Sequence, residues 1–532
     1  MLAFDVGFRH SASSWSFVQF VSNVRQGVPV PFTSHSANRP LDRRSFLYGV
    51  AAFSGAAAVG ALGVPASATP ARRAPANDPT VYDAIVVGGG ISGLAAAKAL
   101  VEAGRTVRVL EARSRAGGRI HNHPTARLGL TTDAGAEFIG PTQDRIDALA
   151  HEYGVEQLPT YNTGLSVFWN GGQRSLFPSD PGLPLDLGTT AALPVIAEIE
   201  AVCADFPVGE PWRHPRAAEW DAITWREWVE QRTDVANARM VLDLAASAAL
   251  SVKGDEFSAL YMLNYFAAST NESTPGPSYF SRLLSTSGGA QERVCNGGAA
   301  LVPLRMAAAL GDVMVYDAPV RSIDQSGEVP VVTSDAGTFR GRRVVVAMSP
   351  AISHRIDYTP ELPERAALCA GYTMGRVGKF AAVYERPWWR DKGLSGQTIG
   401  NGTPSDVTFE NYAEGNHILM GFISAHEMER LDDAPEQQVV DECIESFVGY
   451  FGDEARGYID HSLFRWDHEE WSWGGPVATT APGVLTAHGP ALRTPAGAIH
   501  WAGTETSDYW TGYMDGGVRS GHRAADEILA AL

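Results

Sequence analysis

Residues 81–110 alternate between short apolar runs and a segment with helical spacing. Residues 81–87 are apolar and rich in β-branched side chains, which is typical of a buried strand, and residues 106–110 have the same pattern. Residues 94–103, between these runs, are rich in alanine and leucine and end at Gly104, so they predict a helix. This order predicts a strand–helix–strand unit of an α/β fold.

A glycine-rich turn lies between the first strand and the helix of this unit. Gly88, Gly90 and Gly93 have the spacing G-x-G-x-x-G, which permits a tight turn, a close approach of the backbone to a pyrophosphate, and close packing of the helix on the strand. Glu111 ends the second strand, where a carboxylate accepts hydrogen bonds from ribose hydroxyls. Strand, turn, helix and acid together predict a nucleotide site rather than a turn without function.

Similar patterns further along the chain predict a second set of elements. Apolar residues at helical spacing predict helices, and short apolar runs predict strands. The predicted helices cover residues 224–255 and 435–451 and a C-terminal segment that runs to Leu532, and the predicted strands cover residues 377–384, 418–423 and 499–502 and two segments within 311–323.

The first 68 residues have the pattern of a targeting segment. Arg43 and Arg44 precede an uncharged run rich in alanine and glycine at residues 47–64, and residues 66–68 supply an A-x-A cleavage pattern. The paired arginines resemble the bacterial twin-arginine type of signal peptide, which exports folded proteins. A membrane anchor is the weaker alternative, because the run is short and alanine and glycine give little transfer free energy. We therefore expect export after folding, to the periplasm or the cell exterior, and no stable membrane insertion.

The overall charge narrows the class of ligand. The chain has 42 basic and 60 acidic residues and a formal net charge of −18, which argues against nucleic acid as a partner and is compatible with cationic small molecules. The four cysteines are widely spaced, so neither a metal site nor a disulfide framework is predicted, and the sequence leaves one or two single disulfides open. The sequence leaves a monomer and a homodimer open.

None of the histidines is predicted to be a catalytic base, because the sequence shows no partner residue that would assign this role to one of them. The histidines considered are His121, His123, His354, His468 and His500.

Three separated motifs resemble one family. Residues 111–119 have the pattern E-A-R-x-R-x-G-G-R, residues 133–146 resemble D-x-G-G-x-x-x-G-P-x-Q-x-R, and residues 499–521 contain A-G-T-E-T and G-Y-M-x-G. This combination resembles the FAD-dependent amine oxidase family, and the flavin-containing monoamine oxidases within it. The resemblance covers about residues 80–532. Its only departure within the second motif is mild, since Ala136 replaces a common glycine.

The resemblance implies an α/β flavoprotein with two discontinuous domains. A Rossmann-like FAD-binding domain would comprise residues 80–157, 294–346 and 470–532, and a substrate-binding domain with a mixed sheet flanked by helices would comprise residues 158–293 and 347–469. The residues that would bind FAD are Gly88, Gly90, Ser92, Gly93, Glu111, Arg113, Gly118, Arg119, Gly135, Ala136, Glu137, Phe138, Val320, Trp466, Gly503, Glu505, Gly512, Tyr513 and Met514.

Two segments depart from the monoamine oxidase pattern. The cysteine that bonds to the flavin in monoamine oxidases is matched by Gly475, so FAD is expected to be non-covalent, and the second tyrosine of the aromatic cage is matched by Pro476. Tyr513 would then stand beside the flavin alone, unless Trp473 or another aromatic residue substitutes.

The second departure concerns the family lysine that holds a water near the flavin. Alignment by prolines places Arg355 at its position, and an arginine stays charged and cannot act as a base. Lys379, in a predicted strand, is then interpreted as structural. The expected catalytic residues are Tyr513 and Arg355.

These observations predict FAD-dependent oxidation of a primary or secondary amine to an imine, which is hydrolysed to an aldehyde or ketone while O2 is reduced to H2O2. An L-amino-acid oxidase of the same fold is an alternative, in which Arg145 or Arg355 would bind the substrate carboxylate. A flavin dehydrogenase that passes electrons to a protein acceptor is another. A flavin-binding protein without turnover is disfavoured by the intact motif at residues 505–517.

Overall fold

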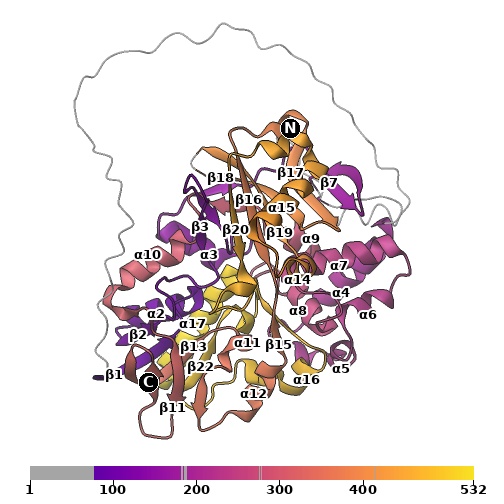
Figure 1. The fold of residues 1–532 in the computed structure, drawn as a ribbon. Coiled ribbons are helices and arrows are strands. Elements are labelled where there is room, and N and C mark those ends of the chain that lie inside the picture. The colour runs from indigo at the N-terminus through magenta and orange to yellow at the C-terminus, as the bar shows by residue number, and fades with distance from the viewer. Residues whose placement is uncertain are drawn as a thin grey trace, which may run out of the picture. The chain divides into compact units, whose positions relative to one another are not determined.

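The computed structural model describes residues 77–532, apart from residues 181, 183, 185–188, 275, 277 and 414. The expected leader, with its paired arginines and its A-x-A pattern, lies outside the described residues. Within the described part, an eight-stranded and a seven-stranded β-sheet provide the framework (Figure 1).

The eight-stranded sheet has a parallel half built on the predicted strand–helix–strand unit. β1 pairs in parallel with β2 and with β13, and β13 pairs in parallel with β22. The sheet has the order β10 (Met314–Val315), β2 (Val107–Leu110), β1 (Asn77–Val87), β13 (Gly337–Ala347), β12 (Val331–Ser334), β11 (Val320–Asp324) and β14 (Asp357–Thr359), with β22 (Ile499–Ala502) on β13. Residues 84–87 are buried on both faces, as parallel strands between helices require.

Two helices from opposite ends of the described chain pack together beside this sheet. α2 (Ile91–Glu102) follows β1, and α17 (Met514–Ala531) is the last helix (Figure 1). A Cβ atom on Gly521 of α17 would lie 2.2 Å from the carbonyl oxygen of Ser92, so the two backbones approach each other closely. The hydroxyls of Ser92 and Ser520 are 3.3 Å apart at this crossing.

The seven-stranded sheet is mostly antiparallel and is buried on both faces at its centre. Its order is β20 (Asp460–Arg465), β16 (Gly378–Tyr384), β19 (Asn416–Ile423), β18 (Ser405–Ala413), β17 (Leu394–Asn401), β7 (Leu165–Asn170) and β8 (Gln173–Pro178). Phe380 and Ala382 of β16 share a core cluster with α15 (Glu436–Phe451), whereas Ala381 and Val383 pack on the opposite face. Lys379 has the same parity as Ala381, which directs it away from α15.

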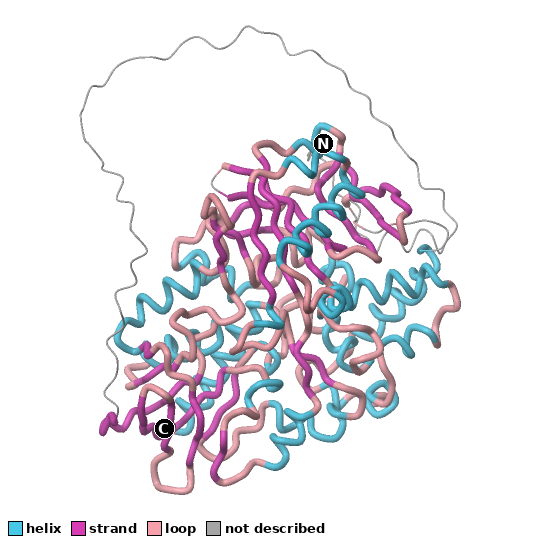
Figure 2. Tube along the Cα trace, in the orientation of Figure 1, coloured by secondary structure: helices cyan, strands magenta, loops and turns pink. Residues whose placement is uncertain are grey.

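A group of helices from residues 193–284 lies next to the edge of the seven-stranded sheet, at the right in Figure 2. They are α4 (Leu193–Cys203), α5 (Ala217–Asp221), α6 (Trp225–Glu230), α7 (Ala236–Leu250), α8 (Ala259–Ala267) and α9 (Tyr279–Leu284). The other helices are α3 (Asp144–Glu152), α10 (Leu301–Leu310), α11 (Pro350–Ser353), α12 (Pro363–Ala370), α13 (Trp388–Asp391), α14 (Ala425–Arg430) and α16 (Val484–His488). Among the described helices, none combines the length and the hydropathy that a membrane-spanning segment needs.

Small sheets complete the framework. They contain β5 (Phe138–Ile139), β9 (Arg293–Cys295) and β6 (Gln157–Pro159); β3 (Asn122–Pro124) and β4 (Thr131–Asp133); and β15 (Tyr372–Met374) and β21 (Ala478–Thr480). The predicted α/β class and the predicted helices and strands are confirmed, except that the stretch 224–255 is divided into α6 and α7. The two-domain division stays a prediction, and β14, which follows the expected boundary at residue 346, pairs with β11 of the eight-stranded sheet.

Candidate active site

The described residues line a cavity of about 400 Å³ between the two large sheets. Val87, Leu110 and Ala347, at the carboxyl ends of β1, β2 and β13, form one wall. Phe409 and Phe422, from β18 and β19, form part of another. Ligands of open α/β sheets bind outside the carboxyl ends of the parallel strands, so the cavity lies where a nucleotide is expected.

Most residues predicted to bind FAD line this cavity. The exceptions are Gly93 and Glu505, which lie behind its wall. The predicted residues that contribute to the wall are Gly88, Gly90, Ser92, Glu111, Arg113, Gly118, Arg119, Gly135, Ala136, Glu137, Phe138, Val320, Trp466, Gly503, Gly512, Tyr513 and Met514.

The glycine turn fits a dinucleotide because its close contacts leave no room for side chains. Gly88 has a φ of +104°, and a Cβ atom there would lie 2.7 Å from the carbonyl oxygen of Ala347. A Cβ atom on Gly93 would lie 1.9 Å from the carbonyl oxygen of Gly88. Glu111 accepts hydrogen bonds from the backbone N–H groups of Gly89 at 2.7 Å and Arg113 at 2.9 Å, so the buried carboxylate also orders the turn.

An ion pair joins the second and the last sequence motif. Arg119 donates two hydrogen bonds to Glu505, at 2.7 and 3.0 Å, and one to the carbonyl oxygen of Pro476 at 2.8 Å. Burial of Glu505 favours its neutral form, but the adjacent guanidinium outweighs this and holds the pKa of Glu505 below its usual range. Glu505 therefore positions Arg119 on the wall and does not itself reach the cavity. Arg113 is held likewise, by Glu469 at 2.6 Å.

Tyr513 lines the cavity immediately before α17, as expected from the motif. Its ring lies 4.9 Å from that of Trp510 and 6.0 Å from that of Tyr265, a second cavity tyrosine that the sequence did not reveal. Burial raises the pKa of Tyr513, so its hydroxyl stays protonated at neutral pH. Trp473 does not complete an aromatic pair, because it is 44% exposed and is not part of the cavity wall.

The structure places Arg355 on the cavity wall beside two tryptophan rings, and its catalytic role stays a prediction. Its side chain is exposed, and its guanidinium lies 4.4 Å from the ring centre of Trp473 and 5.8 Å from that of Trp471. Arg321, next to Val320, approaches the same Trp471 ring at 5.6 Å. Arg355 therefore lies at the end of the cavity lined by Val320 and Arg321, which we call the nucleotide end, and no contact among the described residues joins it to Tyr513.

Lys379, interpreted from the sequence as a structural residue, contributes to the cavity wall. It is the only lysine among the described residues that line the cavity. Its side chain is 4% exposed, and its ammonium donates to the carbonyl oxygen of Gly135 at 3.0 Å and forms an ion pair with Glu137. The signal in the sequence was a lone lysine within the apolar run 377–384.

The part of the cavity formed by α7, β8 and β17 is apolar and uncharged in the described residues. Phe177, Val241, Leu244 and Ile399 line it. Two neutral polar side chains beside them bond to each other, with Thr286 donating to Gln397 at 3.2 Å. The charged residues of the described wall lie elsewhere: Glu111, Arg113, Arg119, Glu137, Arg321, Arg355 and Lys379. We call the uncharged part the substrate end.

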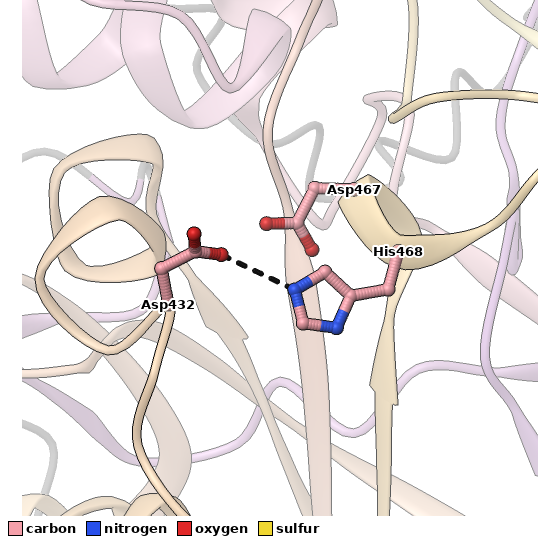
Figure 3. A group of neighbouring side chains, drawn as sticks. All are labelled: Asp432, Asp467 and His468. Carbon is pink, nitrogen blue, oxygen red and sulfur yellow. Dashed lines mark hydrogen bonds and ion pairs between the residues drawn. The ribbon is translucent and has the colours of Figure 1, made fainter.

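A separate group of possible metal ligands contains Asp432, Asp467 and His468, shown in Figure 3. Nε2 of His468 lies 3.2 Å from Asp432, and the guanidinium of Arg465 lies 3.3 Å from both carboxylates. That guanidinium already supplies the positive charge that a cation would bring, so the group is explained as an ion-pair network. All four cysteines are free and buried, and none lines the cavity.

The glycine cradle and the cavity define an α/β enzyme that binds a dinucleotide. Residues 91–529 match the family model of the flavin-containing amine oxidoreductases, so the chain belongs to this family. It is a flavin amine oxidase, and FAD is its cofactor. Because no cysteine reaches the described wall and Gly475 occupies the position of the bonded cysteine, the flavin is held without a covalent bond.

Individual relatives agree with this assignment. AofH of Mycobacterium tuberculosis, named as a flavin-containing monoamine oxidase, is 38% identical over 464 residues, which are 86% of this chain and 98% of AofH. Amine oxidase B of Mus musculus is 33% identical over 463 residues, 85% of this chain and 86% of the mouse protein. The structure of putrescine oxidase bound to putrescine has a TM-score of 0.79 at 29% identity and covers 85% of this chain and 99% of its own. Cyclohexylamine oxidase from Brevibacterium oxydans has a TM-score of 0.78 at 31% identity, with coverage of 85% and 99%.

Proposed function

We propose that the protein oxidises a primary or secondary monoamine with an apolar body to an imine, and that O2 reoxidises the flavin with release of H2O2. The observation that carries this proposal is the uncharged substrate end of the cavity. FAD supplies the hydride acceptor, and the chain orients the amine and excludes water. Free alkylamines have a pKa near 10, and the apolar wall favours the neutral amine, which alone has an available lone pair.

A diamine fits this cavity poorly. A second ammonium group at the substrate end would need a carboxylate partner, since an unpaired buried charge costs several kcal/mol. The two carboxylates of the described wall are already engaged, Glu111 by Gly89 and Arg113, and Glu137 by Lys379. This argument favours a monoamine over a diamine such as the putrescine of the structural neighbour.

An amino acid also fits this cavity poorly, because its carboxylate would lack a positively charged partner at the substrate end. The carboxylate of an amino acid would need an arginine, and the two candidates lie elsewhere. Arg145 is 48% exposed, contacts Asp144 and Glu272, and is not part of the described cavity wall. Arg355 lies at the nucleotide end. The structure therefore offers less support for an L-amino-acid oxidase than for a monoamine oxidase.

A small substrate panel tests the proposal. The FAD-loaded protein is mixed anaerobically with cyclohexylamine, phenethylamine, putrescine and L-leucine, and flavin bleaching is followed before air is admitted and H2O2 is measured. We expect kcat/KM for a monoamine to exceed that for putrescine by about 100-fold, equivalent to about 3 kcal/mol. Bleaching without H2O2 would indicate a dehydrogenase, and a preference for putrescine or L-leucine would contradict the proposed substrate class.

We also propose that residues 1–68 direct export of the folded enzyme. The order of the paired arginines, the uncharged run and the A-x-A pattern supports this proposal. Replacing Arg43 and Arg44 by lysine should retain the enzyme in the cytoplasm with its FAD. N-terminal sequencing of the exported enzyme should place the new N-terminus close to residue 69, and an uncleaved exported chain would contradict the interpretation.

A further inference from the structure

A buried ion pair lies on the wall between the two sheets. Lys379 comes from β16, and Glu137 comes from the segment between β4 and β5, with side chains that are 4% and 1% exposed. One carboxylate oxygen of Glu137 receives the ammonium of Lys379, and the other accepts a hydrogen bond from the side chain of Asn411 in β18. The pair therefore has a fixed geometry, which joins two strands of the seven-stranded sheet to the segment between β4 and β5.

Stability alone does not explain this arrangement. Two buried charges lose hydration, so a buried ion pair contributes little compared with apolar residues of similar volume. A further negative charge is unfavourable in these surroundings. The pKa of the nearby Asp133 is raised to about 7, mainly by its burial and secondly by the negative charge of Glu137. Lys379 and Glu137 nevertheless stay at the wall of the cavity in which amine and flavin meet.

The ammonium group of Lys379 is held in one place only if other residues of the chain bind it. A lysine head group ends a flexible four-carbon stem and rotates freely, so its side chain does not define a direction. Here the carbonyl oxygen of Gly135 and the carboxylate of Glu137 fix it. A fixed charge in a site of low dielectric acts strongly on charge that develops during a reaction, and a displacement of about 1 Å can cost as much as 100-fold in rate.

We propose that Glu137, itself held by Asn411, is the positioning residue for the ammonium of Lys379 during amine oxidation. This role differs from the FAD contact that the family resemblance implied for Glu137. It predicts that loss of the carboxylate impairs turnover through Lys379 and leaves FAD binding intact.

The variant Glu137→Gln tests this role in the FAD-loaded enzyme with a monoamine substrate. We expect kcat to fall about tenfold or more, KM to change less than about threefold, and the FAD content to stay the same. Glu410→Gln is the matched control, because Glu410 is an equally buried carboxylate next to Asn411 that pairs with Arg390 outside the described cavity wall. The control should leave kcat per bound flavin unchanged.

A double-mutant cycle separates a positioning role from a merely structural one. In a Lys379→Met background, Glu137→Gln should change kcat less than about twofold, because its effect passes through the lysine. Glu137→Asp should recover part of the lost turnover. If Glu137→Gln does not fold, Asn411→Ala replaces it in the cycle, with the same expected dependence on Lys379.

Three results would overturn the proposal. The first is an equal loss of kcat with and without Lys379, which would show an independent effect. The second is a loss of FAD in proportion to activity, which would make Glu137 a cofactor contact. The third is normal turnover of Lys379→Met, which would leave nothing for Glu137 to position.

Discussion

The variant Gly93→Ala should damage the FAD site by a single methyl group. Gly93 lies in the first turn of α2, and its Cβ atom would lie 1.9 Å from the carbonyl oxygen of Gly88 and 3.2 Å from a methyl carbon of Val86. Ordinary contacts of this kind are 3.4 Å or longer. The helix and the turn would therefore have to separate by about 1.5 Å, and this movement displaces the N–H groups that face the phosphates.

The expected cost follows from this displacement. Overpacking of a well-packed interior costs about 1–3 kcal/mol, and α2 cannot yield easily because Leu94 and Ala95 on its buried face have no exposed surface. A loss of about 3 kcal/mol in FAD binding corresponds to about 100-fold weaker affinity. We expect the Kd for FAD to rise by about this factor, with a lower melting temperature that added FAD restores only in part.

Titration of the apoprotein with FAD, followed by flavin fluorescence, measures this change. Gly327→Ala is the control, because Gly327 has no neighbouring atom within 4 Å of an added Cβ atom. Its Kd for FAD should stay within about twofold of the parent value. Tight FAD binding and an unchanged melting temperature in Gly93→Ala would refute the reasoning, because they would show that the turn and the helix are not in close contact.

Other predictions concern the flavin, the cavity and the pH dependence of stability. Acid precipitation should release all the flavin into the supernatant, and colour that stays with the denatured chain would contradict the alignment at Gly475. Tyr513→Ala should lower turnover more than FAD content, whereas an equal loss of both would make Tyr513 a packing residue. Lys379→Met should lower kcat at least tenfold and Arg355→Met less than about threefold, since only Lys379 is buried at the wall. Burial raises the pKa of Asp406 to about 7, so its ionisation destabilises the fold progressively as pH rises from about 4 to 7; Asp406→Asn should raise the melting temperature at pH 8 and not at pH 4.5, as measured by calorimetry.

Local sequence determined what could be predicted about the nucleotide site. The spacing of Gly88, Gly90 and Gly93 and the periodicity of the flanking residues are consequences of short-range geometry, and the structure has β1, α2 and β2 where these patterns predicted them. The motif around Tyr513 likewise runs into a helix, as predicted, and α17 begins at Met514. Such features depend on neighbouring residues alone, so one sequence is enough to find them.

The assignment of the cavity lysine depended on distant residues. Alignment by prolines selected Arg355, whereas the ion-pair partner of Lys379 is Glu137, 242 positions away in the sequence. Nothing near residue 379 indicates that a carboxylate will balance its charge. The position of Tyr265 on the cavity wall could not be predicted from the sequence either. Every residue of α8 is buried, so the helix has no polar face that would indicate which of its side chains line the cavity.

The contact between α2 and α17 has a consequence for the biosynthesis of the enzyme. Ser92 and Ser520 meet at this contact but are 428 positions apart, so ribosomes that add about 5–20 residues per second need about 20–90 s to deliver the second partner after the first. During that time the part of α2 that packs on α17 has no cover, and the nucleotide turn lacks the segment that contains Tyr513 and Met514. We therefore expect FAD to bind only after α17 has been synthesised.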